Sequence, residues 1–417
     1  MRANISLRSI GDRFSAIEAA RVLLLIELVV ITFSPALVNL VEFFLILVVV
    51  SSSHLRKAII SSCKTYLPAK ILLAFFFWIV LSAFWGDASV GARLHEVVSW
   101  RKIFLFLLVM ALVSDDFKIV MLRVISTFGV ACAVAVWAIG LLNDVYEGPA
   151  VIMRSDVVQG IYLGLSSLAI LCLLGTNFSK LSSRSRILMS VAALFLLVTV
   201  FSSTGRSGYL FTMVGLCCFS WIAMPRYRLF LTTSIGLTLV TLILLVPTTA
   251  DRFEGALSEI ASVTDGRQDS EFSSMGIRIV MWDNTLDMIG DKPLLGSGAG
   301  SFEDDYGKVA REKATGWRAK RSSDPHQQYL HIAAEFGLVG LGIFLLFLAS
   351  LLLGFKLTFI SIFGMSILLG ISATSFFNGH FSSLVEGRIF WILTPLFLLS
   401  LSEMKDVETP PFGKIPE

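Results

Sequence analysis

A single histidine stands where a polar stretch of the chain meets an apolar one. His326 lies in the segment 324–328 (DPHQQ), directly before a long apolar run, and is one of five histidines in 417 residues. Asp324 suits an N-cap, Pro325 suits the first helical position and Gln327 completes a capping-box pattern, so we predict that His326 lies in the first turn of a helix. The positive end of the helix dipole there favours neutral imidazole, which can accept a proton. His326 is a candidate general base; the alternative is an interfacial residue without a chemical role.

Two glycines follow this histidine along the same predicted helix. Gly337 and Gly340 lie eleven and fourteen residues after His326. At 100° per residue they fall within about 40° of the face that carries His326. Small residues on that face would allow a neighbouring helix to pack closely.

A polar cluster interrupts the apolar run from 187 to 224. Residues 202–208 have the sequence SSTGRSG, with Arg206 at the centre. An arginine at the end of a span is costly unless it reaches lipid headgroups or a ligand. The flanking glycines and serines predict backbone that is exposed around an anion, and a guanidinium group binds phosphate in a bidentate manner. Arg206 is therefore a candidate phosphate ligand, and the alternative is an arginine that reaches lipid phosphate.

A second arginine lies in the long hydrophilic segment. Residues 273–289 predict an amphipathic helix that carries Arg278. Trp282 follows four residues later, a spacing that permits a cation–π contact, and a surface ion pair is the alternative role for the arginine. Arg206, Arg278 and His326, on one predicted membrane face, could bind a lipid-linked pyrophosphate and deprotonate an incoming nucleophile.

The other sequence patterns carry less chemistry. The glycine-rich stretch 294–300 lacks the lysine and Ser/Thr of a phosphate-binding loop and follows no parallel strand, so we predict a structural turn. His95, His331 and His380 are scattered, and no His/Asp/Glu group has the spacing of metal ligands. We expect neither a metal nor a cofactor.

The elements that must position these residues are membrane helices. The chain is 55% hydrophobic with 33 Phe and only 16% charged residues, and its mean hydropathy is +0.79, which excludes an ordinary soluble domain. A span needs about 20 apolar residues. The sequence predicts an all-α integral membrane protein with twelve spans, at 17–33, 36–53, 70–86, 97–114, 118–142, 158–176, 187–204, 207–224, 229–247, 329–353, 357–376 and 388–403.

The distribution of basic residues orients these spans. Lys and Arg are concentrated in one set of short loops and near both termini, so the positive-inside rule predicts cytoplasmic termini. The segment 248–328 then faces outward. Since the sequence shows no targeting segment, we expect a bacterial inner membrane, with the candidate site on the periplasmic side.

Four regions follow from this topology. They are 1–247 with nine spans, 248–328 as one large periplasmic loop that contains helices, 329–403 with three spans, and 404–417 as a cytoplasmic tail. The loop carries ten Lys/Arg and fourteen Asp/Glu. This mixed charge is not that of a nucleic-acid-binding surface.

The segment around the histidine resembles a family motif. The bacterial O-antigen ligase family has His, then Asn, Ser or Gln, nine residues, and then Gly-x-x-Gly/Thr/Tyr. His326, Gln327, Gly337 and Gly340 match every defined position.

Three further features extend the resemblance. Residues 204–208 resemble the family's periplasmic arginine element, and residues 276–278 with Trp282 resemble the arginine of its large loop. Residues 293–298 are similar to a recurrent turn there. Twelve spans with a large periplasmic loop between the ninth and tenth are the family's architecture.

The resemblance implies a membrane glycosyltransferase. Its donor would be O-antigen on undecaprenyl diphosphate, its acceptor a sugar hydroxyl of the lipid A–core oligosaccharide, and its product lipopolysaccharide. The resemblance implies His326 as the base and Arg206 and Arg278 as ligands of the donor diphosphate. It also implies inversion at the anomeric carbon without a metal, in contact with the lipids of a Gram-negative inner membrane.

Other functions remain open at this point. An O-antigen polymerase or a protein O-oligosaccharyltransferase would use the same donor, although the His-Gln…Gly-x-x-Gly element favours a ligase over a polymerase. A secondary transporter is the alternative from another class. Transporters place polar sites near the midplane of matched halves, whereas the polar residues here gather at one face.

Overall fold

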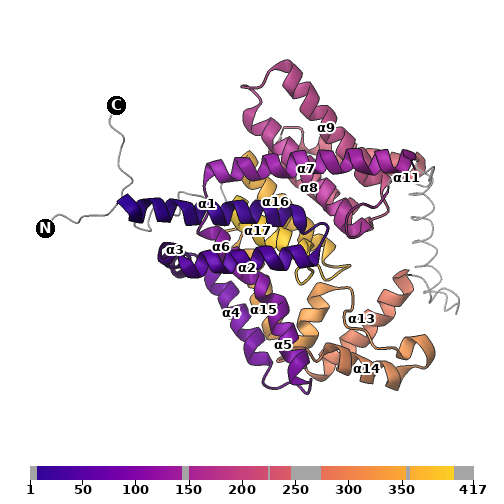
Figure 1. Cartoon of the computed structure of the whole chain (residues 1–417). Helices are drawn as coiled ribbons and strands as arrows, with labels where there is room; N and C mark the ends of the chain where they lie inside the picture. Colours follow the sequence, from indigo (N-terminus) through magenta and orange to yellow (C-terminus); the bar gives the residue numbers. More distant parts are fainter. Residues whose placement is uncertain (1–6, 143–149, 224–225, 246–273, 354–356, 399–417) are drawn as a thin grey trace.

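The described part of the protein is helical throughout. The computed structural model describes residues 7–142, 150–223, 226–245, 274–353 and 357–398 (Figure 1). The predicted tail at 404–417 and residues 248–273 of the predicted loop lie outside the described residues. The α-helices are α1 (Leu7–Val30), α2 (Pro35–Ser51), α3 (Ser53–Thr65), α4 (Leu67–Ser82), α5 (Val90–Ser99), α6 (Ile103–Met110), α7 (Asp115–Leu142), α8 (Asp156–Asn177), α9 (Ser183–Ser202), α10 (Arg206–Ala223), α11 (Arg228–Leu245), α13 (Ser274–Asp291), α14 (Phe302–Lys313), α15 (Gln328–Ser350), α16 (Phe359–Thr374) and α17 (Glu386–Leu398).

The predicted apolar segments all contain helix, but fewer of them meet the length and hydropathy of a membrane span. Within the described residues, four helices, α7, α8, α9 and α15, are long and apolar enough to cross a membrane. The pair α2 and α3 would make a fifth span, bent by 94°. The all-α class and a multi-pass membrane protein are therefore supported, while the number twelve and the orientation stay predictions.

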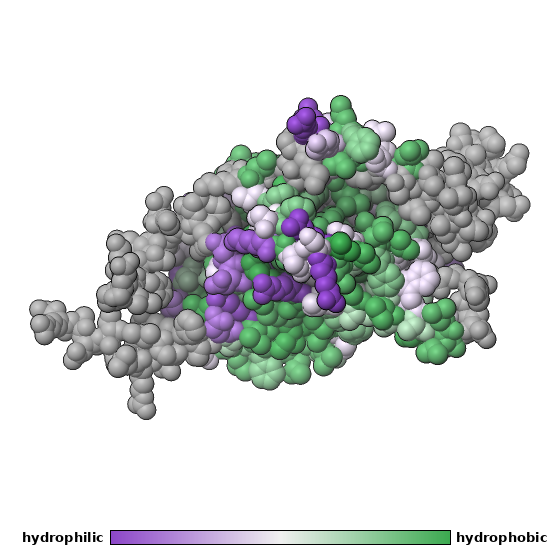
Figure 2. All heavy atoms as spheres, turned by 90° about the horizontal axis from the view of Figure 1, so that it is seen from above, coloured by the Kyte–Doolittle hydropathy of each residue, from purple (hydrophilic) through white to green (hydrophobic). Residues whose placement is uncertain are grey.

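The exterior of the helical bundle is strongly apolar. Phe77, Leu141 and Leu142 are 66%, 74% and 82% exposed. In Figure 2, hydrophobic side chains cover much of the face shown, around a gathered group of hydrophilic ones. A surface of this kind suits contact with lipid, because a soluble protein rarely exposes large continuous apolar patches.

The helices α8, α10 and α16 all pack against one another. Close approach depends on small residues: a Cβ on Gly164 of α8 would lie 2.0 Å from Thr212 Oγ1 of α10. Ser366 of α16 donates a hydrogen bond to Gly215 O of α10 at 3.2 Å. Small and hydroxyl side chains at helix interfaces are typical of membrane bundles.

Two further helices pack at one end of α15. The helix predicted over 273–289 is confirmed as α13, and α14 follows it after the glycine-rich turn. Both pack against α15, and they share a small hydrophobic cluster that includes Met288, Phe302, Tyr306 and Ala334. The helix that carries Arg278 is thus attached to the helix that follows His326.

Candidate functional site

The polypeptide around His326 forms a turn ahead of the helix. Gln327 is the N-cap of α15, and its side-chain oxygen accepts a hydrogen bond from Leu330 N at 2.6 Å. Asp324 Oδ1 instead accepts one from His326 N at 2.7 Å. The prediction that Asp324 caps the helix and that His326 lies in its first turn is wrong, because Asp324 closes a local turn around Pro325 and the glutamine side chain is long enough to cap.

His326 itself has an unusual backbone conformation. Its φ is +53°, and among the described residues it is the one non-glycine residue with positive φ. Its side chain is exposed. Left-handed backbone outside glycine is uncommon and is found preferentially at functional sites. His326 is therefore accessible, and it lies ahead of α15 rather than along the face of that helix.

Gly337 breaks α15 instead of lining its face. Its φ of +71° and ψ of 178° are not helical, and a Cβ there would lie 2.0 Å from the Leu294 carbonyl oxygen. The prediction that Gly337 shares a continuous helical face with His326 is therefore wrong. A glycine is needed because this backbone conformation and this close approach both exclude a side chain.

The turn after α13 supplies the hydrogen bonds that this break leaves open. Four backbone bonds join the two segments: Ser297 N to Ala334 O at 2.8 Å, Gly298 N to Glu335 O at 2.8 Å, Leu338 N to Pro293 O at 2.8 Å and Val339 N to Leu294 O at 3.3 Å. The glycine-rich stretch is thus the structural turn that the sequence predicted. The N–H groups of Ser297 and Gly298 are used by the carbonyl groups of α15, and that of Gly296 by Lys292 O.

Gly340 allows α4 to approach the same break. A Cβ on Gly340 would lie 3.1 Å from the Trp78 ring. The Trp78 indole N–H donates to Phe336 O at 2.8 Å. The expectation that small residues permit close packing is confirmed for Gly340. The two motif glycines thus have different roles: Gly337 allows the turn after α13 to approach α15, and Gly340 allows the Trp78 ring of α4 to do so.

The arginine element is clamped against α8. Gly205 and Gly208 are buried, and Cβ atoms on them would lie 2.4 Å from Asp156 O and 2.5 Å from Gly160 Cα. The expectation of exposed backbone around an anion is therefore wrong, since the glycines serve contact between helices. Arg206, the first residue of α10, is exposed and has no hydrogen bond or ion pair with the described residues.

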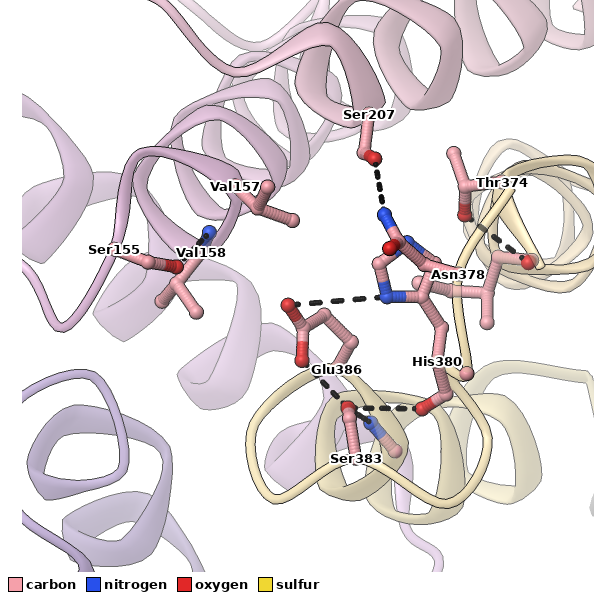
Figure 3. A network of polar contacts seen from close by, with 12 residues as sticks. Ser155, Val157, Val158, Ser207, Thr374, Asn378, His380, Ser383 and Glu386 are labelled. Carbon is pink, nitrogen blue, oxygen red and sulfur yellow. Dashed lines mark hydrogen bonds and ion pairs between the residues drawn. The ribbon is translucent and has the colours of Figure 1, made fainter. Parts of the chain in front are cut away.

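The other side of the arginine element contacts the loop between α16 and α17, residues 375–385. Asn378 Nδ2 donates to Ser207 Oγ at 3.0 Å (Figure 3). In the same loop His380 Nδ1 lies 3.8 Å from Glu386 Oε1. Burial lowers the pKa of His380, although Glu386 and Asp324 act in the opposite direction. Sequence reasoning missed this loop; the polar triplet 378–380 between two apolar segments was the available signal.

Trp282 connects the second arginine helix to the histidine turn. Its indole N–H donates to Pro325 O at 3.0 Å, and its ring centroid lies 6.4 Å from that of Phe377. Trp282 is four residues after Arg278, one turn along α13. The predicted stacking of the arginine on this ring stays a prediction, whereas the tryptophan's contact with the residue before His326 is observed.

A cavity of about 510 Å³ lies where these elements meet. One lining residue comes from each predicted element: Leu210 is one turn after Arg206, Trp282 is one turn after Arg278, and Gln327 is next to His326. The remaining lining residues belong to the end of α16 and the loop that follows, and they are Ala373, Phe376 and Phe377. The structure thus brings the three sequence-predicted elements to one cavity.

Metal ligands are not gathered in the described ranges. No group of three or more His, Cys, Asp or Glu side chains there is arranged to hold a metal ion. The metal-independent mechanism stays a prediction.

Comparison with known proteins finds a family model that matches this region. Residues 191–345 match a protein-family model described as "O-Antigen ligase". That range contains Arg206, Arg278 and His326. An uncharacterized protein of Haemophilus influenzae is 26% identical over 172 residues, which cover 39% of this chain and 42% of the relative. The match thus spans about two fifths of the length of that relative.

Proposed function

We propose that the chain, whose residues 191–345 match the O-antigen ligase family model, is a glycosyltransferase of that superfamily. The protein transfers a glycan from undecaprenyl diphosphate to a sugar hydroxyl of lipid A–core at the periplasmic face of the inner membrane. The product is lipopolysaccharide. The observation that carries the proposal is the cavity on which the elements of Arg206, Arg278 and His326 converge.

The chemical step needs a base and a stabilised leaving group. The acceptor hydroxyl oxygen attacks the anomeric carbon while its proton passes to the His326 imidazole. The bond from the anomeric carbon to the diphosphate oxygen breaks, and the electron pair leaves with undecaprenyl diphosphate. Attack opposite the leaving group inverts the anomeric centre.

The two arginines act on the leaving group. Arg206 and Arg278 bind the diphosphate and stabilise the negative charge that grows on it as the bond breaks. Arg206 suits this role because its flanking residues are fixed while its own side chain is exposed. The energy comes from the activated donor, so a nucleotide site is not required.

The lipopolysaccharide pattern of a strain that lacks the gene tests the proposal. Expression of the wild-type protein should restore glycan-capped lipopolysaccharide, whereas His326→Ala should leave bare lipid A–core with lipid-linked polymer accumulating. His54→Ala on α3 is the matched control, since it removes a histidine far along the chain from the cavity, and it should restore the ladder.

The same gels separate the related activities. Core capped by a single repeat unit in the deletion strain would indicate a polymerase. An unchanged ladder in that strain would refute lipid A–core as the acceptor and would favour a protein acceptor or transport. Full activity of His326→Ala would refute the assignment of the base.

A further inference from the structure

The loop at 375–385 contacts the flanks of both motif segments. Asn378 Nδ2 donates to Ser207 Oγ at 3.0 Å, next to Arg206. On the histidine side, Gln328 Oε1 accepts hydrogen bonds from Ser382 N and Ser382 Oγ, both at 3.0 Å. One short loop therefore bridges the start of α10 and the start of α15.

Two more contacts tie the loop to the rest of the site. Phe377 lies against Trp282 of the helix that carries Arg278. A Cβ on Gly379 would lie 2.8 Å from Asp324 Oδ2, so the loop backbone packs directly on the carboxylate that holds the His326 turn. The loop thus contacts all three elements that surround the cavity.

Buried charges fix this loop from its other side. Lys102 Nζ donates to Ser383 O at 2.9 Å and also to Ser382 O, and Arg388 Nη1 donates to Leu384 O at 3.0 Å. Arg388 is fully buried. A buried charge that loses its hydrogen-bond partners is costly, so these bonds oppose displacement of the loop carbonyl groups. The loop backbone is therefore held in place beside the starts of α10 and α15.

The hydrogen bond from Asn378 joins the loop to the arginine element on a side away from α8. Gly205 and Gly208 press on α8, and Thr204 Oγ1 donates to Asp156 Oδ2 at 3.0 Å on that same side. Ser207 is buried and faces the opposite way, toward Asn378 (Figure 3). The two sets of contacts together fix the backbone from which Arg206 projects.

We propose that Asn378 is a positioning residue for Arg206: by holding Ser207 it sets the direction in which the guanidinium meets the donor diphosphate. The inference rests on the proposed function, because it assumes that Arg206 binds the donor. An arginine needs a defined geometry to bind phosphate with two parallel hydrogen bonds, so a small displacement of its backbone lowers the affinity.

Kinetics of the purified, liposome-reconstituted full chain test this inference. The measured quantities are KM for the undecaprenyl-diphosphate-linked donor and KM for the lipid A–core acceptor. Loss of one neutral hydrogen bond corresponds to about a 2- to 10-fold change. Asn378→Ala should raise the donor KM by about that factor and leave the acceptor KM unchanged.

A double variant shows whether Asn378 acts through the arginine. In an Arg206→Ala background, Asn378→Ala should change the donor KM less than about twofold, because the group that it positions is absent. Ser220→Ala is the control, since it removes a buried hydroxyl near the other end of α10 and should leave the donor KM unchanged. Ser207→Ala breaks the same hydrogen bond and replaces Asn378→Ala if that variant does not fold.

These measurements distinguish a failure of the role proposed for Asn378 from a failure of the proposed function. An equal effect of Asn378→Ala with and without Arg206, or no effect in the wild-type background, overturns the inference alone. An unchanged donor KM in Arg206→Ala refutes the donor site of the proposed function, and the inference falls with it.

Discussion

Substitution of Gly337 by alanine should destabilise the protein far more than the same change five residues later. The new Cβ would lie 2.0 Å from Leu294 O, which is backbone and can move only if the whole turn after α13 moves. Gly342 is on the same helix, and a Cβ added there would meet nothing within 4 Å. Gly342→Ala should be neutral or stabilise by about 0.5–1 kcal/mol, since alanine favours the helix.

The size of the effect at Gly337 follows from two contributions. A non-glycine residue in this backbone region costs about 1–3 kcal/mol. Displacement of the turn also weakens four backbone hydrogen bonds, each with a net contribution of about 0.5–1.5 kcal/mol. We expect a loss on the order of 4 kcal/mol, which is exceptional for a single substitution.

Thermal melting of detergent-purified protein measures this difference. Gly337→Ala should lower the Tm by roughly 5 °C or more relative to Gly342→Ala. Because the turn holds α13 against α15, transfer activity should fall as well. Equal melting temperatures for the two variants would refute the reasoning, since they would show that the helix break and its four hydrogen bonds contribute nothing to stability.

Three further predictions follow from buried contacts. Glu42→Leu removes the carboxylate that accepts a hydrogen bond from the fully buried Arg388 Nε at 2.9 Å, so it should cost about 3–5 kcal/mol in melting experiments, and Arg388→Met in the same chain should recover part of the loss; no recovery would contradict the pairing. Trp282→Phe removes the hydrogen bond to Pro325 O and should lower the free energy of local unfolding by about 1 kcal/mol. Backbone amides near 324–328 should then exchange hydrogen faster, and an unchanged exchange rate would count against this contact. Burial lowers the pKa of His380 below 6.5, so the unfolded chain takes up the proton first and stability should fall as pH drops below about 6.5, by at most about 1.4 kcal/mol per pH unit; His380→Asn should flatten that dependence of Tm on pH.

Much of the helical framework could be predicted from the sequence. Apolar runs locate helices well because burial and lipid contact depend on local composition, and the helix that carries Arg278 was predicted within two residues of α13. Local chemistry was less decisive at the start of α15. Asp324 and Gln327 are both able to cap a helix, and only the three-dimensional structure shows which of them does so.

The structural roles of Gly337, Gly205 and Gly208 could not be predicted from local spacing. Gly337 is required by a turn about forty residues earlier in the chain, and Gly205 and Gly208 are required by α8. Such requirements arise from contacts between distant segments, which a periodic pattern does not contain. Asn378 was missed for the same reason, since its partner lies 171 residues away.

The most direct test of the proposed reaction is glycan transfer by the purified protein in liposomes. The assay would supply undecaprenyl-diphosphate-linked glycan and lipid A–core in the presence of a chelator, with the wild-type protein beside His326→Ala. We predict transfer by the wild-type protein and none by the variant, with donor binding largely retained. Transfer by His326→Ala at the wild-type rate, or a wild-type reaction that stops until Mg²⁺ is restored, would contradict it.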